Sequence, residues 1–241
     1  MASSMDRRRL SESVIERIRR ERYAPRIVQC DYLHLRDVRA VLEGAFSRLT
    51  RIPGPVLDLF CGTQPYREMI PAQPVWGFDV DRHFGRVDIV GGLLLPFDDA
   101  TFSLVLCTQA LHLVEDPATT VREMARVLKP GGTAIVTVPH IFRKEIPEER
   151  HLSDDQLRSL FTGWEVRIDG FGGRLSTAMY TVAGVQNAVA RRWSALRFAS
   201  IPLALIVNIS SIACEALTGH RTGRFNASWL VVAARTKAAS P

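Results

Sequence analysis

Apolar residues follow two different spacings along the chain, and the change comes near Pro53. Before it, the apolar residues at 10–18 and at 35–49 recur every three or four positions, which predicts two helices separated by Pro25. From Pro55 onward, short apolar runs alternate with helical stretches, and the runs are VLDLF, VWGFD, VDIV, FSLVLC and TAIVTVP. This alternation predicts a parallel sheet with helices on both faces.

Two later helices have clear N-terminal signals. Asp116 is placed to cap a helix that starts with Pro117, and the run 129–132, Lys-Pro-Gly-Gly, ends that helix. Residues 153–156, Ser-Asp-Asp-Gln, have the spacing of a capping box, which opens another helix. A strand at WEVRIDGF follows, and WLVVAAR predicts the last strand.

The segment before the last strand is long and in part uncharged. Residues 198–214 carry no charge but include Pro202 and Asn208, so they fall short of a membrane-spanning helix. A buried helix or a lid over the site is the leading interpretation, and contact with a membrane surface is the alternative. We expect one domain in four parts, namely a helical N-terminal cap (1–53), a core (54–172), a helical insertion that forms part of the acceptor site (173–226), and the last strand with a tail (227–241).

The composition is typical of a folded α/β protein, with 46% hydrophobic and 23% charged residues in 241. The cysteines Cys30, Cys61, Cys107 and Cys214 form no CxxC pair and no metal-ligand spacing, so we predict no metal site and a reducing compartment. No apolar run follows the basic N-terminus, so no signal peptide is indicated and a cytoplasmic location is expected.

The net charge of +6 is unevenly distributed, because eight arginines lie between positions 7 and 26. Such a density attracts phosphate, nucleic acid or an anionic membrane surface, whereas a solvated helix face is the simpler interpretation. No ladder of aromatic residues is interleaved with these arginines, which makes nucleic acid an unlikely partner.

The strongest local pattern is VLDLFCGTQPY at 56–66, where an apolar strand runs into a turn containing Gly62. Ligands bind at such strand-to-helix turns, at the carboxyl edge of a parallel sheet. The next strand ends at Asp79, where a carboxylate can accept both hydroxyl protons of a ribose. The GxGxxG pattern that admits a pyrophosphate is absent, so the turn suits an adenosine without phosphates.

Four segments in order resemble the class I S-adenosylmethionine-dependent methyltransferases of the bacterial type 11 group, and they are VLDLFCGT, GFDVD, LLLPFDDATFSLVLC and REMARVLKPGGTAIVTVP. The resemblance implies an α/β, Rossmann-like fold whose seven-stranded sheet is mostly parallel with the last strand antiparallel. It also implies S-adenosyl-L-methionine (SAM) as the cofactor.

The resemblance implies a role for each matching residue. The methionine end of SAM would be lined by Asp58, Cys61, Gly62 and Thr63, and the ribose would be held by Asp79. The adenine would be flanked by Val80, Gly92 and Leu93, and the sulfonium by Cys107, Thr108 and Gln109. Tyr32 either folds over the cofactor or packs within the N-terminal cap.

The chain departs from the family pattern at several positions. Phe60 and Gln64 stand where glycines are usual, Gly91 and Gly92 where an aspartate commonly takes the adenine amino group, and Ser103 where an aspartate is usual. Adenine recognition would then rest on backbone groups and apolar packing. These departures keep open the alternative of a non-catalytic partner protein with this fold.

An acceptor hydroxyl must lose its proton during methylation, which makes histidine the candidate base. His112 follows the fourth predicted strand, His140 follows the fifth, and His151 precedes the capping box. For each, a histidine satisfied by backbone hydrogen bonds is the simpler interpretation, and a carbon or amine acceptor needs no dedicated base.

The predicted function is methylation of a small-molecule acceptor, as an O- or C-methylation in secondary metabolism, because the cap and the insertion would roof an enclosed pocket. A membrane-associated or lipid-linked acceptor is the alternative, which the N-terminal arginines and residues 198–214 would serve. RNA or protein methylation ranks lower, since the fourth strand ends CTQA without an NPPY-type tetrapeptide. The oligomeric state stays open, a homodimer included.

Overall fold

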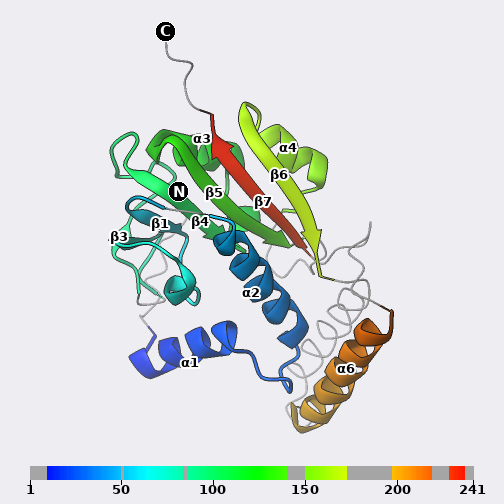
Figure 1. The fold of residues 1–241 in the computed structure, drawn as a ribbon. Helices are drawn as coiled ribbons and strands as arrows, with labels where there is room; N and C mark the ends of the chain where they lie inside the picture. Colours follow the sequence, from blue (N-terminus) through cyan, green and yellow to red (C-terminus); the bar gives the residue numbers. More distant parts are fainter. Residues whose placement is uncertain are drawn as a thin grey trace.

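The computed structural model describes residues 10–49, 52–83, 86–139, 150–172, 197–218 and 228–236. Its centre is a seven-stranded sheet in the order β3-β2-β1-β4-β5-β7-β6 (Figure 1). The strands are β1 (Val56–Leu59), β2 (Val75–Asp79), β3 (Ile89–Val90), β4 (Phe102–Thr108), β5 (Leu128–Pro139), β6 (Trp164–Phe171) and β7 (Ser228–Arg235). The first five strands are mutually parallel, and β7 runs antiparallel to both β5 and β6. The predicted fold class is therefore confirmed.

Helices cover both faces of the sheet (Figure 1). They are α1 (Glu12–Tyr23), α2 (Tyr32–Ser47), α3 (Pro117–Val127), α4 (Asp154–Leu160) and α6 (Arg197–Thr218), with short 3-10 turns η1 (Arg67–Met69) and η2 (Leu111–Leu113). One apolar cluster joins α2 to the sheet through Val38, Leu42 and Phe46, and the other joins α3 and α4 through Met124 and Leu157. Strand β1 is buried along its whole length, as expected for a parallel strand between two helical layers.

The predicted helix caps are present. The Asp116 side chain accepts the Thr119 N–H at 3.0 Å, with Pro117 in the first turn of α3. At α4, Ser153 Oγ accepts the Gln156 N–H, and Gln156 Oε1 accepts the Ser153 N–H. These caps fix where α3 and α4 begin, and therefore how they lie against β5 and β6.

Helix α6 lies within the predicted insertion, of which residues 173–196 and 219–226 are outside the described residues. It is attached to the N-terminal cap, because Asn208 Nδ2 donates to the carbonyl oxygens of Ile27 at 2.6 Å and Gln29 at 2.9 Å. An ion pair of 3.0 Å between Arg36 and Glu215 adds a second contact. Among the described helices, none is long and apolar enough to cross a membrane.

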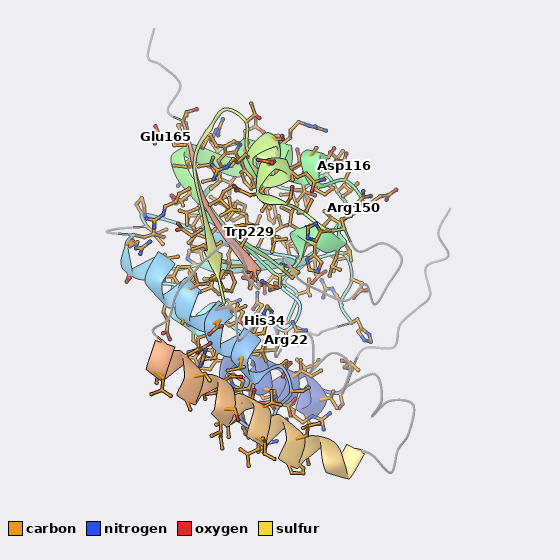
Figure 2. All side chains as sticks on the ribbon, turned by 90° about the vertical axis from the view of Figure 1, so that its right-hand side faces the viewer. Arg22, His34, Asp116, Arg150, Glu165 and Trp229 are labelled. Atoms are coloured by element: carbon orange, nitrogen blue, oxygen red, sulfur yellow. The ribbon has the colours of Figure 1, made fainter. Side chains whose placement is uncertain are left out.

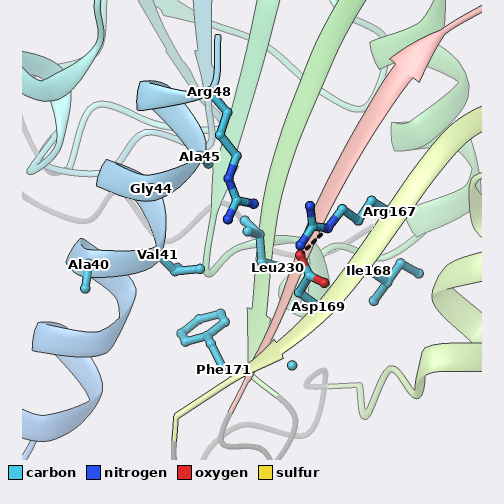
Figure 3. A pocket seen from close by; sticks show the side chains of 11 residues that line it. Ala40, Val41, Gly44, Ala45, Arg48, Arg167, Ile168, Asp169, Phe171 and Leu230 are labelled. Carbon is cyan, nitrogen blue, oxygen red and sulfur yellow. Dashed lines mark ion pairs between the residues drawn. The ribbon is translucent and has the colours of Figure 1, made fainter. Parts of the chain in front are cut away.

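A groove of about 520 Å³ runs between α2 and β6 (Figure 3). Arg48, which follows α2, and Arg167 of β6 lie on its two walls, with Leu230 between them. Arg167 pairs with Asp169 at 2.7 Å. None of the residues that the sequence predicts for cofactor binding lines this groove. The candidate site is therefore built elsewhere, at the carboxyl edge of the sheet.

Candidate functional site

The turn after β1 has a left-handed backbone at three positions. Phe60, Gly62 and Gln64 have φ values of 56°, 53° and 50°, so the two residues that replace family glycines adopt the conformation that glycine takes most easily. Side chains in this region cost on the order of 1 kcal/mol each in backbone strain. The turn therefore keeps a glycine-like path although two of its residues are not glycine.

Asp79 links the end of β2 to this turn. Its Oδ2 accepts the Gly62 N–H at 2.8 Å, and its Oδ1 accepts the Val80 N–H at 2.8 Å. The Cys61 N–H donates to the Phe78 carbonyl at 3.0 Å, which adds a second bond between the two segments. Burial raises the pKa of Asp79, and the two backbone hydrogen bonds oppose that rise. The carboxylate is thus already oriented at the carboxyl edge, where the sequence places a ribose.

Asp58 is the other buried carboxyl group at this edge. Burial raises its pKa to about 8, with Arg67 opposing the rise and the negative charge of Asp79 adding to it. A buried carboxyl group of this kind is neutral when the site is empty. A positively charged group placed beside it would restore the ionised form.

The end of β4 supplies the next part of the edge. Gln109 has a φ of 53°, and its N–H donates to the carbonyl of Thr137 at 2.9 Å and to its Oγ1 at 3.1 Å. Burial raises the pKa of the Cys107 thiol above its ordinary range, and it does the same for Cys61. Both cysteines are therefore neutral thiols, which suits a lining role and not a nucleophilic one.

Exposed apolar side chains lie along the β2–β3 side of the edge. Val80 is 57% exposed and Leu93 is 36% exposed. Gly92, next to Leu93, also faces open space, because a Cβ added to it would meet no atom within 4 Å. Gly91 differs, since a Cβ there would come within 2.8 Å of the Phe78 ring. The loop thus presents an open apolar surface next to Asp79.

Buried polar contacts hold this loop against α3. The Leu95 N–H donates to Glu123 Oε2 at 2.8 Å. The Arg126 guanidinium donates to the carbonyl oxygens of Leu95 at 2.9 Å and Phe97 at 2.7 Å, and it also pairs with Glu123 and Asp99. One arginine therefore connects the loop to the helix behind it.

Two histidines meet at the end of β4. His112 of η2 is 7% exposed, and burial lowers its pKa to about 4. Burial also lowers the pKa of His34, in α2, to about 4. The charges of Arg22 and His112 lower this pKa further, and a hydrogen bond with Gln109 opposes the change. Figure 2 labels His34 and Arg22 side by side near the end of the sheet.

The structure therefore brings together one predicted histidine and one that sequence reasoning missed. His34 lies in the CDYLHLR stretch, two residues after Tyr32, which is half-buried at the start of α2. The only sequence signal for His34 was its place beside that tyrosine. His151 is exposed, although the neighbouring Arg150 N–H donates to the His112 carbonyl at 2.9 Å. His140 lies outside the described residues.

Residues 58–136 match the model of a family described as methyltransferase domain. A demethylmenaquinone methyltransferase of Chlorobaculum tepidum is 29% identical over 110 residues, which cover 40% of this chain and 46% of that protein. A probable S-adenosylmethionine-dependent methyltransferase of Mycolicibacterium smegmatis is 33% identical over 134 residues, half of each chain. The chain thus spans about half the length of these curated relatives.

Among solved structures, the [4+2]-cyclase SpnF has the same fold, with a TM-score of 0.55 at 18% identity over 83% of this chain and 82% of that one. At this identity the likeness concerns the fold alone, and one fold serves several chemistries. The family match covers β1 to β5, with the turn after β1, Asp79 and the end of β4. Residues 58–136 thus match the methyltransferase domain family, and the fold around them is that of the class I S-adenosylmethionine-dependent methyltransferases.

Proposed function

We propose that this chain transfers a methyl group from SAM to a small-molecule acceptor at the carboxyl edge of β1, β2 and β4. The observation that carries the proposal is the Asp79 carboxylate, which is fixed by the Gly62 and Val80 N–H groups beside an open apolar surface. A ribose needs such a carboxylate, and an adenine needs such a surface. The name of the M. smegmatis relative supports the choice of methyl donor.

The residues present fit the amino-acid end of SAM as well. The hydroxyl oxygens of Thr63 and Thr108 are buried and have no hydrogen-bond partner among the described residues. Buried polar atoms are normally paired, so their partners are expected to come from a ligand. Asp58 would receive the ammonium group, and Cys61, Cys107 and Gln109 would line the space around the sulfonium.

When bound, SAM supplies a methyl group that is already activated for in-line transfer to an acceptor electron pair. The chain's own residues then align the acceptor and exclude water. His112 is neutral near pH 7, because burial lowers its pKa to about 4, so its imidazole can accept a hydrogen bond from an acceptor hydroxyl and orient it, while a pKa this low makes it a weak base. His34 and Gln109 lie beside it and would position the acceptor.

The acceptor class is inferred from one relative and from the helices near the carboxyl edge. The C. tepidum relative is named for methylation of demethylmenaquinone, which is neither a protein nor a nucleic acid. The N-terminal cap and α6 lie near the carboxyl edge, where they would enclose a small acceptor (Figure 1). O- or C-methylation in secondary metabolism, within the cytoplasm, is the form of the reaction that we favour.

Calorimetric titration with SAM and S-adenosylhomocysteine tests the cofactor site. We expect micromolar binding of both, and a loss of roughly tenfold or more in affinity for Asp79→Ala, because a tenfold change corresponds to only about 1.4 kcal/mol. Asp155→Ala, which removes an exposed carboxylate from α4, is the matched control and should bind like the wild type. If the folded wild type binds neither compound, the proposal is wrong and a non-catalytic role takes its place.

A further inference from the structure

Three polar residues of helix α6 face the protein. Asn208 and Ser211 are buried, at 1% and 0% exposure, and Glu215 is half-buried in its pair with Arg36. The Asn208 side chain is held by the carbonyl oxygens of Ile27 and Gln29. Polar contacts therefore join α6 to the N-terminal cap.

Most of the exposed side chains of α6 are apolar, with Ser210 and Cys214 as exceptions. Ile201, Ile206, Ile209 and Leu217 are 52%, 63%, 50% and 86% exposed. Between residues 201 and 217 the only charged residue is Glu215, and it faces the cap. An ordinary surface helix has the reverse arrangement, with apolar residues inside and charged residues outside. This face is therefore suited to an apolar environment outside the protein.

Positive charge lies at the same end of the molecule. Figures 1 and 2 both show α1 and α6 at one end, and the Asn208 contacts join α6 to the segment after α1. Arg17, Arg20, Arg22 and Arg26 are exposed, and none of them forms an ion pair within the described part of the chain. Over residues 1–26, eight arginines outnumber four acidic residues.

We propose that α6 lies in the surface of an anionic lipid bilayer, with its exposed aliphatic side chains among the lipid tails and the α1 arginines against the headgroups. An aliphatic face flanked by arginines is the pattern of helices that lie in the plane of such a surface. Since α6 is not apolar enough to span a membrane, it lies in the interface and does not cross it. In Figure 1 the strands β4, β5 and β6 point toward the end of the molecule that holds α1 and α6. If α6 lies in the bilayer surface, the carboxyl edge of the sheet therefore faces the bilayer.

This inference rests on α1 and α6 and does not depend on methyl transfer. The test is co-sedimentation of the full chain with vesicles of phosphatidylcholine alone and of phosphatidylcholine mixed with phosphatidylglycerol. We expect binding to the anionic vesicles, weaker binding to the neutral ones, and loss of most of that difference at about 1 M salt, where charges are screened beyond about 3 Å.

Two variants separate the two contributions. Ile206→Ser with Ile209→Ser should lower vesicle affinity roughly tenfold or more, because the double substitution removes two exposed aliphatic side chains. Neither isoleucine makes the hydrogen bonds that hold α6 on the cap, so the helix should stay in place. Arg17→Gln with Arg20→Gln should reduce the preference for anionic vesicles. Trp76→Ser is the control, since Trp76 is 42% exposed near the amino end of β2, at the other edge of the sheet, and should leave binding unchanged.

Thermal unfolding and S-adenosylhomocysteine binding are measured on the same samples, so that a misfolded variant or an empty cofactor site is recognised separately. Absence of binding by the folded wild type, or unchanged binding by the isoleucine variant, would overturn the proposal. A dimer in solution that the isoleucine variant dissociates, without vesicle binding, would assign the α6 face to a second copy of the chain instead.

Discussion

The Asp79 carboxylate accepts the backbone N–H of Gly62 at 2.8 Å, so the end of β2 fixes the turn that follows β1. The other oxygen of the same carboxylate accepts the Val80 N–H, also at 2.8 Å. The group that would hold the ribose is thus oriented before any ligand arrives. A site ordered in advance loses less conformational entropy on binding.

Binding of SAM should release a proton through Asp58. In the empty site, burial raises the pKa of this carboxyl group to about 8, so at pH 7 it is mostly protonated. The ammonium group of SAM lowers that pKa, and up to about one proton leaves per ligand bound. Calorimetry at pH 7 in phosphate and in Tris buffer measures this release as a difference in binding enthalpy.

Asp58→Asn is the matched variant, because it keeps the shape of the side chain without the proton. The enthalpies in the two buffers should then agree, while weaker binding persists through Asp79. If the wild type shows no difference between the buffers, Asp58 does not receive the ammonium group.

Gly77 and Gln64 should be coupled in stability. A Cβ at Gly77 would lie 2.0 Å from Gln64 Nε2 and 3.0 Å from the Arg86 carbonyl oxygen, so Gly77→Ala should destabilise the chain by about 1–3 kcal/mol. Gln64→Ala removes the atom that is in the way, so the double variant should lose less than the two single variants together. Urea unfolding of all four proteins measures the coupling, and strictly additive losses would contradict it.

Arg126 should hold the loop of residues 91–97 in place. Arg126→Lys keeps the charge but cannot donate to Leu95, Phe97, Asp99 and Glu123 at once, so we expect a loss of roughly 1–3 kcal/mol in the free energy of unfolding. Because Gly92 and Leu93 belong to this loop, S-adenosylhomocysteine affinity should fall too. Arg122→Lys on the exposed side of α3 is the control, and an equal effect of both variants would refute the bridging role.

The parts that sequence reasoning predicted are those with local signals. Strand β1, the turn with Gly62, Asp79 and the caps of α3 and α4 each depend on a few consecutive residues. Phe60 and Gln64 looked like departures from the family pattern, yet their φ values of 56° and 50° keep the usual backbone path. The identity of a residue in such a turn is thus a weak guide to the path of the turn, because the neighbouring strands impose the backbone conformation.

The parts that sequence reasoning missed depend on tertiary contacts. His34 is brought beside Gln109 and His112 only because α2 packs across the end of β4. The outward face of α6 was equally hidden, since its apolar residues predict a buried side. The Asn208 contacts with Ile27 and Gln29 decide which face is turned inward.

Acid should destabilise the chain through His112. Its pKa is lowered from 6.5 to about 4 in the folded state, so between these values the unfolded chain binds the extra proton first. The stability that neutral His112 contributes is therefore complete above pH 6.5 and is lost as the pH falls toward 4. One pKa unit corresponds to about 1.36 kcal/mol, so we expect a loss on the order of 1–3 kcal/mol across this window.

Comparison of variants at each pH isolates this effect, because Asp58, whose pKa is raised, acts in the opposite direction over the same window. The difference in the free energy of unfolding between wild type and His112→Gln, measured with urea, should therefore shrink as the pH falls from 6.5 to 4.

His34→Gln should behave in the same way, since burial also lowers the pKa of His34 to about 4. His151→Gln, at an exposed position, controls for the loss of an imidazole. A constant difference between His112→Gln and wild type at every pH would mean that His112 is as easily protonated in the folded chain as in the unfolded one, which contradicts a lowered pKa.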